Sequence, residues 1–141
     1  MIQRRQTIWL LLAAITAFSY TQVPLFAGTL PDATAKNFIA TENLLLFALA
    51  VLIGLMAAAA IFLYKNRPMQ IKLAMFGLLG SIALIALEVW LLDKFKLDNA
   101  VTTGSYAWGS LLPILMIVFF IMAWSGIRKD QKLIKSLDRL R

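Results

Sequence analysis

Four long apolar stretches, separated by short charged segments, dominate this chain. They cover residues 8–26, 44–64, 73–92 and 106–127. Each has about 20 residues, which at a helical rise of about 1.5 Å per residue matches a hydrocarbon core of about 30 Å. We therefore expect an all-α protein, an integral membrane four-helix bundle. Residues 1–141 then form a single membrane domain, because the four spans and their connections use the whole chain.

The composition supports lipid as the solvent for most side chains. Hydrophobic residues make up 61% of the 141 residues, whereas roughly half is usual for a soluble domain. The chain has no cysteine and no histidine. It therefore lacks the residues that most often form disulfides, bind zinc or haem, and act as general bases near neutral pH. We expect no cofactor, no metal site and no enzymatic activity.

The first apolar stretch is compatible with a membrane span or with a secretory signal. Arg4 and Arg5 followed by an apolar run are typical of such a signal. A cleavage site would require small residues in an A-x-A-like pattern. Leu25 occupies a position that should be small, ahead of Phe26, Ala27 and Gly28. We interpret the segment as a retained first span.

The basic residues predict the orientation of the spans. Eleven of the 14 lysines and arginines lie before the first stretch, between the second and third, or after the fourth. The other three are Lys36, Lys94 and Lys96. The positive-inside rule then places both termini in the cytoplasm. Aromatic residues expected at the two membrane interfaces are Trp9, Tyr64 and Trp124 on one side and Trp90, Tyr106 and Trp108 on the other.

Small residues indicate where the helices pack, since they let two backbones approach closely in a membrane. The second and third stretches are joined by a short turn and should form an antiparallel hairpin. We expect their small-residue faces to meet. The fourth stretch contains Pro113, which predicts a kink. The predicted packing residues of the hairpin are Ala50, Gly54, Ala58, Gly77 and Ser81.

One acidic residue, Glu88, falls inside a predicted span, about one turn from its outer end. An acid in the membrane is costly and marks a functional candidate. The simpler interpretation is that it reaches the interface or pairs with Lys94 or Lys96. The outer half of the first stretch is also polar and should face the bundle, within reach of the Glu88 region. Together they predict a small polar pocket formed by Glu88, Ser19, Tyr20 and Gln22.

The connections on the outer side carry no recognisable motif. Residues 31–40 favour a short helix lying in the interface, and Thr41 is the expected N-cap of the second span. Residues 102–105, Thr-Thr-Gly-Ser, are interpreted as a flexible turn.

The end of the chain, residues 128–141, predicts a basic amphipathic helix. Leu133, Leu137 and Leu140 share one face at helical spacing. Such a helix would bind anionic headgroups of the inner leaflet, at about 1 kcal/mol per nearby basic residue. Docking to a partner protein is the alternative. Nucleic-acid binding is not expected, because no stacking rings interleave the charges. The basic residues of this tail are Arg128, Lys129, Lys132, Lys135, Arg139 and Arg141.

The two ends of the chain are similar in sequence to a known protein family. The start, MIQRRQTIWLLLAAI, and the basic ending, GIRKD followed by KLIKSLDRLR after one residue, resemble a family of small four-span proteins from Bacteroidota that is known as a domain of unknown function. The resemblance implies a multi-pass protein of the bacterial inner membrane. It transfers no activity.

The expected function is that of a non-catalytic accessory or scaffold subunit of a membrane complex, or of a protein that associates with itself. The alternative is a small oligomeric transporter or channel that uses Glu88 and the polar outer half of the first span. Four helices rarely enclose a path alone, so the alternative requires several copies.

Overall fold

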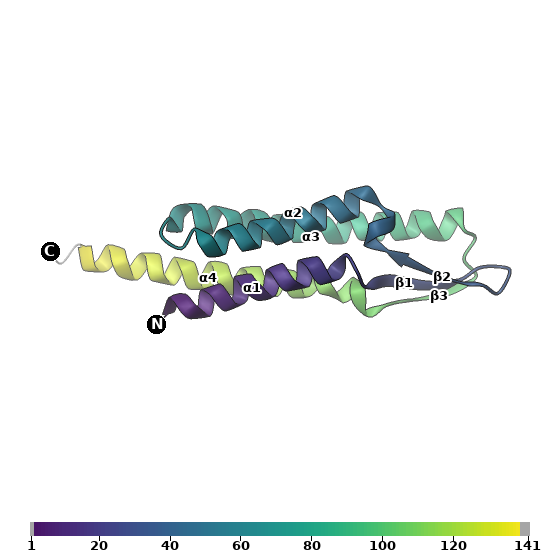
Figure 1. Ribbon diagram of the computed structural model, residues 1–141, viewed down its shortest axis with the longest axis horizontal. Helices are drawn as coiled ribbons and strands as arrows, with labels where there is room; N and C mark the ends of the chain where they lie inside the picture. Colours follow the sequence, from purple (N-terminus) through teal and green to yellow (C-terminus); the bar gives the residue numbers. More distant parts are fainter. Residues whose placement is uncertain (1, 139–141) are drawn as a thin grey trace.

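The computed structural model describes residues 2–138, which form an elongated bundle of four α-helices (Figure 1). Helix α1 packs against α2 and α4, and α3 packs against the same two helices. This arrangement leaves α1 and α3 on one diagonal of the bundle and α2 and α4 on the other. The helices are α1 (Ile2–Tyr20), α2 (Leu44–Phe62), α3 (Arg67–Asp98) and α4 (Leu112–Asp138).

Three of the helices are long and apolar enough to cross a membrane. They are α2, α3 and the helical segment Trp108–Ile134, which includes most of α4. The apolar part of α1, Gln6–Tyr20, is shorter. The prediction that the first helix extends to residue 26 is wrong, because α1 ends at Tyr20 and a strand begins at Pro24. Pro24 has no amide hydrogen for a further helical turn.

Two asparagines begin the central helices. Asn43 Oδ1 accepts hydrogen bonds from the amides of Leu45 and Leu46 at 3.0 and 3.4 Å, so Asn43 and not Thr41 is the N-cap of α2. Asn66 Oδ1 accepts from the Met69 amide at 3.3 Å and begins α3. Pro113 is the second residue of α4. A proline is well tolerated there, so it starts the helix instead of kinking it.

A small antiparallel sheet extends the bundle at the end opposite the termini (Figure 1). Its strand order is β2-β1-β3, with β1 (Pro24–Thr29), β2 (Ala35–Ile39) and β3 (Thr103–Tyr106). The all-α prediction is therefore incomplete. The expected interfacial helix over residues 31–40 is wrong, since β2 and a short 3-10 helix, η1 (Ala40–Glu42), occupy most of this region. The expected flexible turn is largely strand β3, which pairs with β1.

The sheet rests on the last turns of α3, which extend beyond the other helices (Figure 1). The ring of Phe95 on α3 lies 6.5 Å from that of Phe26 on β1 and 5.1 Å from that of Phe38 on β2. Phe26 also meets Tyr106 of β3 edge-on at 5.7 Å. A side chain at Gly104 would collide with the Phe26 ring, which explains glycine at this position. We call this end of the molecule the sheet cap.

The glycines of α2 and α3 leave space for large side chains of other helices. Gly54 faces the ring of Phe18 on α1, and Gly77 faces the ring of Phe120 on α4. The two helices of the hairpin do pack together, with Gly80 against Ile53. The prediction that Gly54 and Gly77 bring two small-residue faces together is therefore wrong. Of the other predicted packing residues, Ala50 and Ser81 are fully buried and Ala58 is half-buried.

The basic tail continues α4 without a break up to Asp138. Among its residues, Arg128, Lys129 and Lys132 are exposed. The side chain of Lys135, together with Arg139 and Arg141, lies outside what the structure describes. The described part of the tail, the N-terminal end of α1 and the turn between α2 and α3 all lie at the same end of the bundle (Figure 1). We call it the basic end.

Candidate functional site

The hydrogen bond between Tyr20 and Glu88 is the main polar contact inside the bundle near the sheet cap. The Tyr20 hydroxyl donates to Glu88 Oε2 at 3.1 Å. Tyr20 is fully buried and Glu88 is only 4% exposed. Tyr20 ends α1, and Glu88 belongs to α3. Because these helices are diagonal to one another, the bond crosses the centre of the bundle.

The spacing of α3 explains why Glu88 points inward. The buried residues of this helix recur every three or four positions, which defines one face. Glu88 falls on that face, between Leu84 and Leu91. The expected pairing with Lys94 or Lys96 is wrong. Lys96 pairs with Asp93 at 3.6 Å, and Lys94 lies over the Trp90 ring at 5.4 Å from its centroid.

The structure brings together only two of the four residues of the predicted pocket. Ser19 is half-buried, and its carbonyl accepts hydrogen bonds from the amides of Gln22 and Val23 at 3.0 and 3.2 Å. Gln22 is exposed, and its side-chain amide donates to Thr21 Oγ1 at 3.3 Å. These residues close the end of α1 and do not line a space around Glu88.

A phenol that is hydrogen-bonded to a carboxyl group inside a helical bundle can have a structural role or a role in proton transfer. In an apolar surrounding, an unpaired polar group would be costly, so the pair holds α1 and α3 in a fixed relation. A carboxyl group can also take up and release a proton. The described residues contain no group of three or more His, Cys, Asp or Glu side chains that could hold a metal ion.

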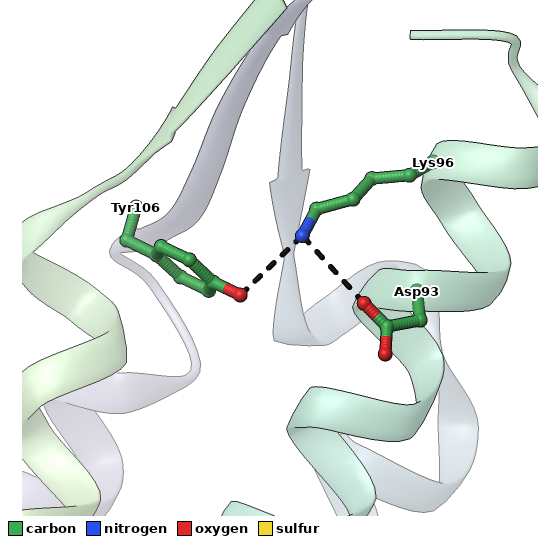
Figure 2. Close-up of polar contacts among 3 residues, drawn as sticks. All are labelled: Asp93, Lys96 and Tyr106. Carbon is green, nitrogen blue, oxygen red and sulfur yellow. Dashed lines mark hydrogen bonds and ion pairs between the residues drawn. The ribbon is translucent and has the colours of Figure 1, made fainter.

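The three lysines of the sheet cap lie against aromatic rings, with Lys36 over the Phe95 ring at 5.5 Å from its centroid. No sequence pattern predicted this cluster. Figure 2 shows Lys96, whose Nζ donates to the Tyr106 hydroxyl at 3.3 Å and lies 3.6 Å from Asp93 Oδ1. The same Nζ lies 5.1 Å from the centroid of the Phe26 ring. Lys36 donates to Asn99 Oδ1 at 2.9 Å. Such cation–π contacts strengthen the attachment of the sheet to α3.

A second buried polar pair lies at the basic end. Gln6 Nε2 of α1 donates to Asp130 Oδ2 of α4, and both residues are buried. Gly126 leaves the space that the Gln6 side chain fills. Near the α2–α3 turn, Gln70 Nε2 of α3 donates to the carbonyl of Ala60 on α2 at 3.0 Å. No pattern in the sequence pointed to these contacts, because polar residues are ordinary near the ends of a span.

Comparison with known proteins shows which family this chain belongs to. A family model described as "Domain of unknown function (DUF4293)" matches residues 2–140. The chain belongs to the DUF4293 family. This confirms the resemblance to a domain of unknown function. No curated protein and no solved structure matches the chain.

Two surface hollows of this DUF4293 chain lie near the sheet cap. One, of about 440 Å³, is lined by Tyr106, Ala107, Trp108, Ser110 and Leu111. The other, of about 280 Å³, lies between the start of α2 and the end of α3, and its lining includes Asn43, Lys94 and Asp98. Neither contains Tyr20 or Glu88, so the buried pair is separate from both hollows.

Proposed function

We propose that this DUF4293 chain is an integral protein of the bacterial inner membrane and serves as a non-catalytic accessory or scaffold subunit of a membrane complex. The observation that carries the proposal is the division of polar and apolar side chains. The buried polar side chains pair inside the bundle, Tyr20 with Glu88 and Gln6 with Asp130. The outward faces of the helices are apolar.

These outward faces need a cover, because large apolar surfaces are unfavourable in water. Only about a third of the residues in each candidate span are buried inside the molecule: 33%, 33% and 28%. Lipid covers such surfaces, and so do the helices of a larger assembly. Exposed apolar residues occur on every helix, including Ile15, Leu52, Phe62, Phe76, Ile82, Leu115 and Ile121.

The arrangement of charge supports an orientation with both termini in the cytoplasm. The basic end gathers the two termini and the α2–α3 turn (Figure 1), and these segments hold eleven of the 14 basic residues. The sheet cap holds the other three, among four acidic residues: Asp32, Glu42, Asp93 and Asp98. The positive-inside rule favours the basic end as the cytoplasmic one.

Site-specific photo-crosslinking in intact cells tests the subunit role. A photo-reactive residue replaces one outward side chain on each helix in turn: Ile8, Leu52, Phe76 or Leu115. A subunit is expected to give one recurrent protein adduct from neighbouring positions, because a partner covers one side while lipid covers the others. The same partner should copurify in mild detergent at a constant ratio. Recovery of the lone chain at every detergent strength, with no protein adduct from any position, would refute the role.

A second candidate function is a small oligomeric transporter or channel, and the burial of Glu88 favours it, because acids inside membrane helices often serve ion pathways. Flux across proteoliposomes containing the wild-type chain and the Glu88→Gln variant tests it. A transporter that uses Glu88 predicts flux that the substitution abolishes. Equal flux from both would remove Glu88 from the path, and no flux from the wild type would eliminate this candidate.

A further inference from the structure

The smaller of the two surface hollows at the sheet cap lies where β2, the start of α2 and the last turns of α3 meet. Its volume is about 280 Å³. The apolar part of its lining consists of Phe38, Leu91 and Phe95, and all three are buried. The rings of Phe38 and Phe95 pack with their centroids 5.1 Å apart. The packing of β2 on α3 therefore gives the hollow a fixed apolar base.

The polar part of the lining carries both signs of charge. Lys94 and Asp98 lie about one helical turn apart on α3, and both are exposed. Within the described part of the chain they form no ion pair with each other, and the ion pair nearby joins Lys96 to Asp93. A cationic and an anionic group thus border one hollow, and neither is neutralised by the other.

The two asparagines of the lining differ in what they can offer a ligand. Asn43 Oδ1 is engaged with the first amides of α2, which leaves its Nδ2 group as a donor. Asn99 accepts a hydrogen bond from Lys36 through Oδ1 and donates to a backbone carbonyl of α3 through Nδ2. The groups that can meet a ligand are therefore the donors of Asn43 and Lys94 and the carboxylate of Asp98.

The hollow lies at the height where the apolar surface of the bundle ends. Asn43 begins α2, and the residues that follow it, Leu44 and Leu45, are exposed. Trp90 lies one turn before Lys94 on α3 and is also exposed, and tryptophans prefer the headgroup level of a bilayer. A lipid whose headgroup occupied the hollow would place its acyl chains beside these apolar side chains.

We propose that this hollow binds the headgroup of phosphatidylethanolamine from the outer leaflet. The phosphate oxygens accept hydrogen bonds from Lys94 Nζ and Asn43 Nδ2, and the ammonium group donates to the Asp98 carboxylate. Hydrogen bonds between ionised groups are stronger than those between neutral ones. The inference rests on the proposed membrane location and orientation.

Ethanolamine fits this lining better than the other common headgroups do. Its phosphate and ammonium groups match Lys94 and Asp98, whereas a glycerol headgroup has no cation for the carboxylate. The quaternary ammonium of choline has no N–H to donate. The volume of about 280 Å³ lies just below the range of about 300–1,000 Å³ for pockets that hold drug-sized ligands, so the hollow suits a small polar group.

Native mass spectrometry of the full chain with phosphatidylethanolamine or phosphatidylcholine of identical acyl chains tests the proposal. Both lipids are zwitterions, so the basic end does not distinguish them. The wild type should retain phosphatidylethanolamine about threefold better, as expected for one exposed charged contact. Asp98→Asn should abolish this preference. Lys94→Gln should weaken retention of both lipids about threefold, and Lys94→Arg, which keeps the charge, should retain both.

Asp32→Asn is the matched control, because Asp32 is an exposed acid of the sheet cap that does not line the hollow, and it should leave the preference unchanged. Equal retention of the two lipids by the wild type, or a preference that survives Asp98→Asn, would overturn the proposal. Equal effects of Asp32→Asn and Asp98→Asn would mean that the charges act diffusely. Displacement of the lipid by equimolar phosphoethanolamine would assign the hollow to a soluble zwitterion instead. The measurement needs no protein partner, so its failure is distinct from failure of the subunit role.

Discussion

At the scale of single residues, the pairing of Tyr20 with Glu88 shows how the bundle tolerates a carboxyl group. The phenol supplies a donor from the diagonal helix, at 3.1 Å, so neither polar group is left without a partner in an apolar interior. The sequence pointed to both residues, because polar side chains stand out inside apolar stretches. It did not reveal that they bond across the centre, since that depends on how α2 and α4 separate α1 from α3.

Removal of the phenol hydroxyl should destabilise the protein. Tyr20→Phe keeps the ring but leaves the buried Glu88 without its donor, at a cost of about 1–3 kcal/mol. Thermal unfolding of the purified protein in detergent measures the change. Tyr64→Phe is the matched control, because Tyr64 is 51% exposed, and it should leave the melting temperature nearly unchanged. Similar melting of both variants would contradict a stabilising role for the Tyr20–Glu88 bond.

At the scale of elements, the helices followed from the sequence and the sheet did not. Four apolar stretches predicted four helices, because a run of about 20 apolar residues is hard to bury otherwise. The first half of strand β1, residues 24–26, falls inside the predicted first span, since a short apolar run does not distinguish strand from helix. Its partner β3 is remote in the chain, with Thr29 paired to Thr103. No local pattern reports such a pairing.

The register of β1 and β3 can be tested with introduced cysteines, because the chain has none of its own. Ala27 and Ser105 are direct partners, and directly paired residues are close enough for a disulfide. The double variant Ala27→Cys with Ser105→Cys should form an intramolecular disulfide under mild oxidation, seen as a mobility shift on a non-reducing gel. Ala27→Cys with Thr103→Cys is diagonal and should react far less. Equal reaction of both pairs would contradict the register.

The contact between α3 and α4 gives a second test at this scale. Any side chain at Gly77 would meet the ring of Phe120. Gly77→Ala should therefore lower stability by about 1–3 kcal/mol through overpacking. Adding Phe120→Leu should restore part of the loss, because the smaller side chain leaves room for the methyl group. Thermal unfolding of the single and double variants measures this coupling, and purely additive losses would argue against the contact.

At the scale of the whole molecule, apolar helices join two ends of different character. The basic end gathers both termini and the α2–α3 turn, and the sheet cap forms the opposite end (Figure 1). The segregation of charge was visible in the sequence, because it needs only the order of spans and loops. The folded cap was not, since its aromatic and lysine contacts join β1, β2, β3 and α3.

Cysteine labelling in intact cells tests the central claim most directly. Thr34→Cys at the sheet cap and Ser136→Cys at the basic end introduce single thiols at exposed positions. A membrane-impermeant maleimide is expected to label Thr34→Cys in intact spheroplasts and Ser136→Cys only after the membrane is opened. The labelled protein should sediment with membranes. Labelling of Ser136→Cys in intact spheroplasts, or recovery of the protein in the supernatant without detergent, would contradict the account.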